Sequence, residues 1–328
     1  MACFLDPASP MMLEEAKATF GAMLDGAGTD EEVAAFLVAL ADRGETSAEI
    51  AGAALAMRER MIAIEAPDTA IDVCGTGGDG QHTLNVSTAV ALVVAACGVP
   101  VAKHGNRAAS SKAGGADVLE ALGVNLAITP DVAEAQLHDL GICFLFAQAH
   151  HPALKRLAPI RKSIGKRTIF NLLGPLANPA RVRRQLVGVA KPALVGVYAE
   201  AMRLLGTERA MIVAGDEGLD ELSISGVSQF VSIGFDLGHT IIAPEGAGLP
   251  RHPLSAIRGG DPAYNAAALR RLLEGEAGAY RDAVLLNAAA ALIVAGQARD
   301  GEDGIEEAAE AIDKGLANAL LNCWIAWQ

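Results

Sequence analysis

The N-terminal part of the chain repeats apolar and polar positions at helical spacing. Residues 13–24 show this spacing, and two further stretches begin with capping boxes at residues 29–32 and 46–49. In a capping box, a threonine hydroxyl and a glutamate three positions later each satisfy a free backbone N–H at a helix start. The pattern predicts three short helices that end near Met61, followed by a linker at residues 65–68.

Beyond this linker, short apolar runs alternate with helical stretches. The expected strands are residues 70–73, 99–102, 142–146, 186–189 and 210–214. The expected helices are residues 88–97, 117–122, a stretch that starts at Pro130, and 194–205. This alternation predicts an α/β fold with a mostly parallel central sheet, behind the small helical unit. Ligands of such sheets bind beyond the carboxyl ends of the strands.

Composition is that of a folded chain without a membrane span. Of the 328 residues, 52% are apolar and 20% are charged, and the formal net charge of −13 disfavours a nucleic-acid partner. The most apolar stretch, residues 88–101, is interrupted by Gly98 and Pro100 and is shorter than the roughly 20 residues of a span. The N-terminal sequence lacks the basic and apolar regions of a signal peptide. We expect neither a membrane nor a nucleic acid as partner.

Cysteine usage predicts a reducing compartment. The chain has five cysteines, an odd number at wide spacing and without a CxxC pair. They are Cys3, Cys74, Cys97, Cys143 and Cys323. Because unpaired thiols are typical of cytosolic proteins, we expect a cytoplasmic location.

Basic residues gather in two segments that contain no acid. Residues 80–116 hold three basic residues and residues 140–199 hold ten. In a chain that is acidic elsewhere, this distribution indicates a focused site for anions. Chance clustering on solvated surfaces is the alternative.

The strongest candidate for phosphate binding is the glycine-rich loop at residues 75–80, between an expected strand and an expected helix. Four of its six residues are glycine, which allows positive φ and close approach of the backbone to a ligand. Successive N–H groups there can form an anion nest, and the helix that residues 85–88 open favours phosphate at its N-terminus. The loop is neither GxGxxG nor a Walker A sequence, and a tight structural turn is the alternative.

A second polar cluster follows the expected strand at residues 99–102. Residues 103–107 read Lys-His-Gly-Asn-Arg, and Ser110, Ser111 and Lys112 come soon after. The segment contains cations, an amide and hydroxyls but no acid, so we expect a loop that binds an anion. A polar loop without function is the alternative.

An acidic segment at residues 216–221 follows another expected strand. Adjacent carboxylates suit Mg²⁺, which proteins usually hold by one or two carboxylates together with substrate oxygens and water. On its own, a solvated acidic turn is the commoner explanation. The phosphate-binding loop elsewhere in the chain is what favours a metal site.

The basic segment 140–199 contains two more features. His150 and His151 are adjacent and cannot share one helical face, so a structural role is favoured over metal ligation. Arg161 is suited to bind a small carboxylate through two parallel hydrogen bonds. The Gly-Pro and Asn-Pro steps within residues 174–179 predict a rigid bend, which can serve as a hinge.

Taken in order, these segments resemble the anthranilate phosphoribosyltransferase family. The matching stretches are GTGGDG, NVST, KHGNRAASSK, AHHP, residues 161–179 and GLDELSISG, and the resemblance runs from about Leu13 to about Ala317. It implies a homodimer of nucleoside-phosphorylase-like fold. It also implies a small helical domain of residues 1–66, joined by about 152–179, and a larger α/β domain of residues 67–151 and 180–328.

The resemblance implies the transfer of phosphoribose from 5-phosphoribosyl 1-diphosphate to the nitrogen of anthranilate, with Mg²⁺, in tryptophan biosynthesis. The implied donor-binding residues are Gly75, Gly78, Asp79, Thr83, Asn85, Val86, Ser87, Thr88, Lys103, His104, Gly105, Asn106, Arg107, Ala108, Ala109, Ser110, Ser111 and Gly115. The implied anthranilate-binding residues are Gly75, Asn106 and Arg161, with His104 and Pro175 lining the channel. The implied magnesium ligands are Ser87, Asp220 and Glu221.

The chain departs from the family pattern at Gly115, where a hydroxyl residue is frequent. We expect weaker binding of the sugar phosphate there, because a side-chain contact is lost. Residues 227–249 match the family only loosely, and residues 324–328 match nothing of use. No general base is assigned, although His104 is a candidate proton acceptor.

Two other functions remain open on the sequence alone. The first is a pyrimidine-nucleoside phosphorylase of the same fold, which the KHGNR segment and the Asp220–Glu221 pair disfavour. The second is a relative that binds nucleic acid without catalysis, which the net charge of −13 disfavours.

Overall fold

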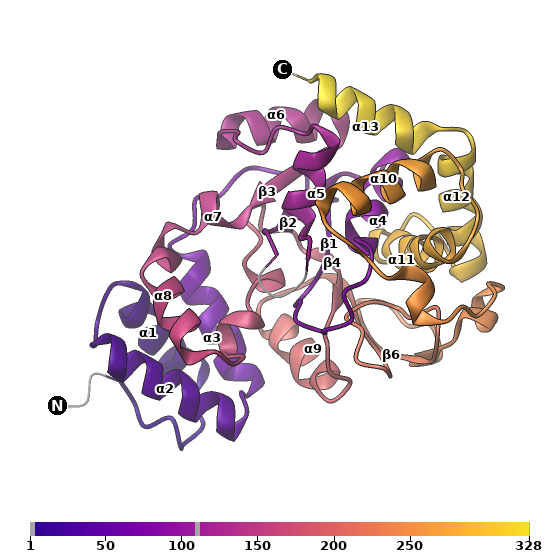
Figure 1. The fold of residues 1–328 in the computed structure, drawn as a ribbon. Coiled ribbons are helices and arrows are strands. Elements are labelled where there is room, and N and C mark those ends of the chain that lie inside the picture. The colour runs from indigo at the N-terminus through magenta and orange to yellow at the C-terminus, as the bar shows by residue number, and fades with distance from the viewer. Residues whose placement is uncertain (1–3, 109–111, 328) are drawn as a thin grey trace.

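The computed structural model describes residues 4–108 and 112–327, and it places a unit of N-terminal helices beside a larger α/β body (Figure 1). The N-terminal helices are α1 (Leu13–Leu24), α2 (Asp30–Arg43) and α3 (Ser47–Arg58). Both predicted capping boxes are confirmed: Thr29 accepts from the N–H of Glu32, and Thr46 accepts from the N–H of Glu49. The third helix ends three residues before the predicted end at Met61.

One mostly parallel sheet forms the centre of the α/β body, as the alternation predicted, and in the described residues it has seven strands where five were expected. Its strands are β1 (Ile71–Gly75), β2 (Val101–Gly105), β3 (Ile142–Phe146), β4 (Arg184–Gly188), β5 (Arg209–Gly215), β6 (Ser228–Ile233) and β7 (Ile241–Ile242). The spatial order is β3-β2-β1-β4-β5-β6-β7. The first five strands of this order are parallel, and β6 and β7 continue the sheet antiparallel, in the tract that matched the family only loosely.

The boundaries of β2 correct one prediction. We expected Lys103 and His104 in a loop after a strand that ended at residue 102, but β2 continues to Gly105. Both side chains are buried, at 4% and 6% exposure. A buried lysine and histidine can continue a strand here because the parallel ladder with β3 satisfies their backbone groups, and polar partners in the interior satisfy their side chains.

Further helices surround the sheet, and one of them packs on the N-terminal helices instead. They are α4 (Val86–Ala96), α5 (Gly115–Leu122), α6 (Pro130–Leu140), α7 (Ala147–His150), α8 (Leu157–Ile164), α9 (Leu194–Leu204), α10 (Pro262–Leu273), α11 (Ala279–Ala295), α12 (Gly301–Asp313) and α13 (Leu316–Ala326). Short 3-10 turns occur at Pro152–Lys155, Ile169–Asn171, Pro175–Ala177, Pro244–Ala247 and Leu254–Ile257. The sequence patterns we used did not identify α10 to α13. Within the described residues, no helix combines the length and apolarity that crossing a membrane requires.

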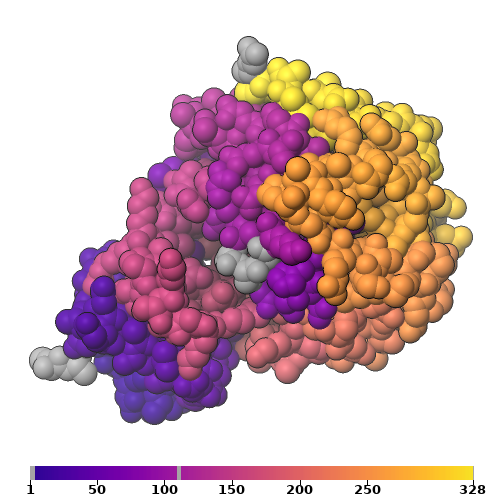
Figure 2. Space-filling view, viewed as in Figure 1, coloured from indigo at the N-terminus to yellow at the C-terminus, as the bar shows by residue number. Residues whose placement is uncertain are grey.

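The segment between β3 and β4 packs on the N-terminal helices. Leu157, Ile160 and Leu173 share one buried cluster with side chains of α1, α2 and α3. The rings of Phe20 and Phe170 meet edge to face, with their centroids 6.0 Å apart. Figure 2 shows this segment and the N-terminal helices as one lobe beside the larger lobe. We therefore keep the proposed assignment of residues 1–66 and about 152–179 to one helical domain.

Two strand-end glycines allow the acidic segment to lie on the sheet. A Cβ at Gly188, the last residue of β4, would overlap the carbonyl oxygen of Asp220. A Cβ at Gly75, the last residue of β1, would overlap the carboxylate of the same aspartate. Because neither glycine carries a side chain, Asp220 is placed directly over the carboxyl ends of two adjacent strands.

Replacing Gly188 with Ala is expected to displace the Asp220 backbone and to destabilise the fold by about 1–3 kcal/mol or more, as overpacking does. Gly196→Ala is the control, because Gly196 lies within α9 and a Cβ there meets nothing within 4 Å. That substitution should be neutral or stabilise by up to about 1 kcal/mol. Urea denaturation of both variants measures the difference, and equal stabilities would contradict the proposed close contact.

Candidate active site

The candidate site is a cleft beyond the carboxyl ends of β1 and β2. It consists of two adjoining pockets of about 200 Å³ and 350 Å³ that share Gly75, Gly77, Gly78 and Gly114. The first is lined by the glycine loop, the start of α4 and the Asp220–Glu221 pair, and the second also by Arg161 and Phe170. A larger cavity of about 680 Å³ lies between β5, β6, α11 and α12, but its walls are mainly apolar and contain none of these residues.

The glycine loop has the backbone conformation that its composition predicts. Gly77, Gly78 and Gly80 have φ values of 69°, 70° and 75°, which disfavour residues with a Cβ. The N–H of Gly77 donates to Asp220 Oδ2 at 2.7 Å. The loop therefore begins at the end of β1 and is attached to the acidic segment across the cleft.

The acidic segment divides into residues that face the cleft and residues that do not. Glu221 Oε1 accepts from the N–H of Ser87 at 3.0 Å and from its hydroxyl at 2.9 Å. Glu217 instead accepts from the hydroxyls of Ser223 and Ser225, and Asp216 accepts from Gln229. Only the last two acids of residues 216–221 thus line the site, as the family resemblance implied.

The electrostatics of Ser87, Asp220 and Glu221 fit a hard cation. Burial, together with the charge of Asp79, raises the pKa of Asp220 to about 7. Burial and the charge of Asp220 raise the pKa of Glu221. Glu221 Oε2 is buried without a hydrogen-bond partner among the described residues. These oxygens suit Mg²⁺, which proteins usually hold by one or two carboxylates together with substrate oxygens and water. The described residues contain no group of three acidic, His or Cys ligands.

Lys103 lies beneath the cleft instead of in a loop above it. Its ammonium donates to the carbonyl of Val73 at 2.7 Å. The Lys103 charge opposes the burial that raises the pKa of Asp72, a fully buried carboxylate on β1. Asp72 also accepts from the Asn178 amide at 2.8 Å and from the N–H of His104 at 3.1 Å. These hydrogen bonds join β1 and β2 below the site. The sequence did not single out Asp72 and Asn178 because neither lies in a recognisable motif.

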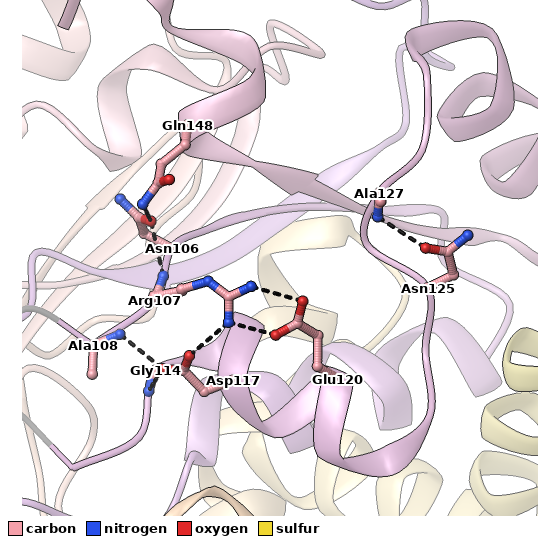
Figure 3. Close-up of polar contacts among 9 residues, drawn as sticks. All are labelled: Asn106, Arg107, Ala108, Gly114, Asp117, Glu120, Asn125, Ala127 and Gln148. Carbon is pink, nitrogen blue, oxygen red and sulfur yellow. Dashed lines mark hydrogen bonds and ion pairs between the residues drawn. The ribbon is translucent and has the colours of Figure 1, made fainter. Parts of the chain in front are cut away.

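Arg107 was predicted to bind an anion, but in the structure it contacts acids. Its guanidinium forms ion pairs with Asp117 and Glu120 on α5 (Figure 3). Asp117 also accepts from the N–H groups of Ala108 and Gly114, at 2.9 Å each (Figure 3). Asp117 therefore holds both described ends of the loop between β2 and α5. Of the predicted donor residues, Ala109, Ser110 and Ser111 lie outside the described residues.

The predicted acceptor residues gather around the second pocket. Arg161 on α8 lies over the ring of Phe170, with 5.7 Å from its guanidinium carbon to the centroid, and burial lowers its pKa. Asn106 and Pro175 line the same pocket. Among the described residues the guanidinium of Arg161 forms no hydrogen bond or ion pair, so it is available to a carboxylate ligand.

His104 is buried and neutral. Burial and, to a smaller extent, the nearby His151 ring, with a centroid distance of 5.2 Å, together lower its pKa to about 3. Nδ1 lies 2.9 Å from the carbonyl oxygen of Gly174, so Nδ1 carries the proton and Nε2 is left as an acceptor. Nε2 is buried without a partner among the described residues, and His104 lines the second pocket.

Comparisons with known proteins agree with this geometry. The family model described as "Glycosyl transferase family, a/b domain" matches residues 67–318. The model described as "Glycosyl transferase family, helical bundle domain" matches residues 11–61. The anthranilate phosphoribosyltransferase of Novosphingobium aromaticivorans is 66% identical over 98% of each chain. That of Sphingopyxis alaskensis is 64% identical, over 99% of this chain and 98% of the relative. The chain belongs to the anthranilate phosphoribosyltransferase family.

Solved structures of anthranilate phosphoribosyltransferases have the same fold. The enzyme of Thermus thermophilus is 44% identical, with a TM-score of 0.93 over 97% of this chain and 96% of that one. The enzyme of Saccharomyces cerevisiae in complex with PRPP and Mg is 30% identical, with a TM-score of 0.87 over 98% and 93%. The predicted combination of a small helical unit with a larger, mostly parallel α/β body is therefore confirmed.

Gly115, the departure from the usual anthranilate phosphoribosyltransferase pattern, is the first residue of α5. A Cβ there would lie 3.1 Å from Thr88 Oγ1, which is closer than ordinary van der Waals contact. A hydroxyl side chain at this position would therefore crowd Thr88 unless α4 or α5 moved slightly. Weaker binding of the sugar phosphate at Gly115 stays a prediction.

The buried histidines predict a dependence of stability on pH. Burial lowers the pKa of His151 to about 4 as well, so both rings have folded-state values below the ordinary value of about 6.5. Their contribution to stability is complete above about pH 6.5 and is lost as the pH falls from there, because the unfolded chain takes up protons first. His151→Gln should make this decline shallower by up to about 1.4 kcal/mol per pH unit. Urea denaturation between about pH 6.5 and pH 5 measures it, and an unchanged slope would refute the assignment.

Proposed function

We propose that this chain transfers the phosphoribosyl group of 5-phosphoribosyl 1-diphosphate to anthranilate. The products are N-(5-phosphoribosyl)anthranilate and diphosphate, and the step belongs to tryptophan biosynthesis. One observation carries the proposal: the oxygens of Ser87, Asp220 and Glu221 lie across a pocket from a glycine loop with positive φ. A cation site beside an anion nest is what a Mg²⁺-bound diphosphate requires.

The first pocket is proposed to bind the donor. The predicted donor residues that line it are Gly75, Gly78, Asp79, Thr83, Asn85, Ser87 and Thr88. Ser87, Asp220 and Glu221 would hold Mg²⁺, which neutralises charge on the diphosphate when it is bound. The oxygens of Asp220 and Glu221 are held in place by Gly77 and Ser87, so little rearrangement is needed for the donor to bind.

The second pocket is proposed to bind anthranilate. Arg161 supplies a planar pair of N–H donors for the carboxylate, and Asn106 and Pro175 lie in the same lining. Gly75 lines both pockets, so an amine in the second pocket can face the sugar in the first. Much of the rate enhancement would come from holding the two anionic substrates so that the amine nitrogen is in line with the ribose carbon and the leaving diphosphate.

In the reaction the amine nitrogen forms a bond to the ribose carbon, and the bond to diphosphate breaks with its electron pair leaving on the diphosphate. The nitrogen then loses one proton. His104 Nε2 is an acceptor that lines the acceptor pocket, and it is proposed to accept a hydrogen bond from the amine. Because the pKa of His104 is lowered to about 3, the ring is too weak a base to remove the proton from the amine before bond formation, and the general base stays unassigned.

We also propose that the protein acts as a cytoplasmic homodimer. Burial raises the pKa of the thiols of Cys74 and Cys143, and the free cysteines at these positions suit a reducing compartment. Leu5 and Met12, at 47% and 71% exposure, provide apolar surface on the helical unit for a second copy. We further predict that the helical unit moves towards the α/β body about a hinge at residues 174–179. This movement would bring Arg161 and its carboxylate ligand towards the sugar.

The activity is tested by mixing the protein with anthranilate, the phosphoribosyl donor and Mg²⁺. We expect a loss of anthranilate fluorescence that depends on all three additions. Phosphorolysis of thymidine or uridine, with no reaction of anthranilate, would establish the nucleoside phosphorylase instead.

Glu221→Gln is expected to raise the Mg²⁺ concentration at half-maximal rate by about tenfold or more, because it removes a charge from the cation site. Asp216→Asn is the matched control, since Asp216 lies in the same acidic segment but contacts Gln229 outside the pocket. Titration of the rate with Mg²⁺ measures both variants. If the two variants need the same Mg²⁺ concentration, Glu221 is not a ligand.

Arg161→Ala is expected to raise the KM for anthranilate by about tenfold to a hundredfold. This is the loss of affinity expected when a charge-assisted pair of hydrogen bonds is removed. The KM for the phosphoribosyl donor should change little. Lys162→Ala is the control, because it removes the same charge from the exposed side of α8. An unchanged anthranilate KM in Arg161→Ala would show that the acceptor binds elsewhere.

A further inference from the structure

Arg167 lies against the glycine loop, although it belongs to the segment that packs on the helical unit. It follows α8 by three residues and precedes the 3-10 turn at Ile169–Asn171. Its guanidinium carbon and Nη1 lie 3.8 Å from the position that a Cβ on Gly78 would occupy. The guanidinium therefore lies within van der Waals reach of the loop at Gly78. Arg167 therefore places a positive charge from the segment between β3 and β4 beside the loop that is proposed to bind diphosphate.

The charge of Arg167 is not used within the described part of the chain. Its Nη2 is buried and has no hydrogen-bond partner there. A guanidinium cannot lose its proton in a protein, so a buried N–H without a partner has a cost in free energy. Glu45, in the turn between α2 and α3, is the acid whose pKa the Arg167 charge lowers, against the burial that raises it. The two form no hydrogen bond or ion pair, so Glu45 leaves the donors of Arg167 available.

The surroundings indicate which ligand Arg167 would take. Gly78 and Gly80 have positive φ, next to Gly77, whose N–H already donates to Asp220, and nests of positive-φ backbone bind anions. A planar guanidinium beside the nest matches the geometry of phosphoryl oxygens through two parallel N–H donors. The chemistry is therefore that of a phosphoryl group of a diphosphate, held on one side by the loop and on the other by Arg167.

We propose that Arg167 is a further substrate-binding residue, which contacts the diphosphate of the donor from the helical side of the cleft. This inference rests on the proposed function, because it uses the glycine loop as the diphosphate site. Arg161 and Arg167 then have separate tasks, since the first lies over Phe170 in the acceptor pocket and the second lies against Gly78. The helical unit would thus contact both substrates, with one arginine for each.

The test compares Arg167→Gln with Lys166→Gln, which removes a neighbouring charge that pairs with Asp42 on the surface. Binding of inorganic diphosphate with Mg²⁺ is measured by calorimetry, and the KM of each substrate by the fluorescence assay. Arg167→Gln should weaken diphosphate binding and raise the donor KM by about tenfold to a hundredfold, while the anthranilate KM stays within about twofold. Arg167→Lys should recover part of the loss, and Lys166→Gln should behave as the wild type.

Other outcomes overturn the inference in distinguishable ways. If Arg167→Gln binds diphosphate as tightly as the wild type, Arg167 does not contact it and the proposed function stands. If the wild type itself neither binds diphosphate nor consumes anthranilate, the proposed function fails and this inference fails with it. A loss of thermal stability with equal changes in both KM values would show a structural role.

A second variant keeps the test decisive if Arg167→Gln folds poorly. Glu45→Gln removes the acid that opposes an anion near Arg167, so it should strengthen diphosphate binding by about twofold to tenfold, as expected for one charge near a protein surface. Unchanged or weaker binding in Glu45→Gln would count against the inference.

Discussion

The site depends on the close contact of one acidic segment with the ends of two parallel strands. Asp220 lies where side chains at Gly75 and Gly188 would be, so the absence of two Cβ atoms sets the height of its carboxylate above the sheet. From there Asp220 accepts from Gly77, and Glu221 accepts from Ser87 at the start of α4. A single backbone approach therefore fixes the acidic pair, the glycine loop and the first turn of α4 relative to one another.

The cleft collects polar atoms that the fold leaves without partners. Glu221 Oε2, His104 Nε2 and Arg167 Nη2 are all buried, and each lacks a hydrogen bond within the described residues. Buried polar atoms of this kind reduce stability, so ligands that satisfy these three atoms would remove that cost. The three atoms differ in chemistry, since the first suits a cation, the second a hydrogen-bond donor and the third an anion. Under the proposed function, these ligands would be a metal ion, an amine and a diphosphate.

The helical unit is joined to the sheet by shared packing as well as by the chain. Buried side chains of α1 to α3, of the segment after β3, and of α9, β4 and β5 form one continuous cluster. At the other end of that segment, Asn178 donates to the buried Asp72 and to the carbonyl of Ala102, which ties it to β1 and β2. The segment that lines the helical side of the cleft is therefore held at its base by contacts with β1 and β2.

Local patterns in the sequence determined much of this protein. Capping boxes set the starts of α2 and α3, because the groups that pair are three residues apart. The glycines of residues 75–80 allowed the positive φ that Gly77, Gly78 and Gly80 adopt. Only the tertiary structure showed that Arg107 pairs with Asp117 and Glu120, that Lys103 lies below the cleft beside Asp72, and that Glu217 turns away from it. The direction of a side chain and the partner of a charge depend on residues that are distant in the chain, and the sequence alone does not record those distances.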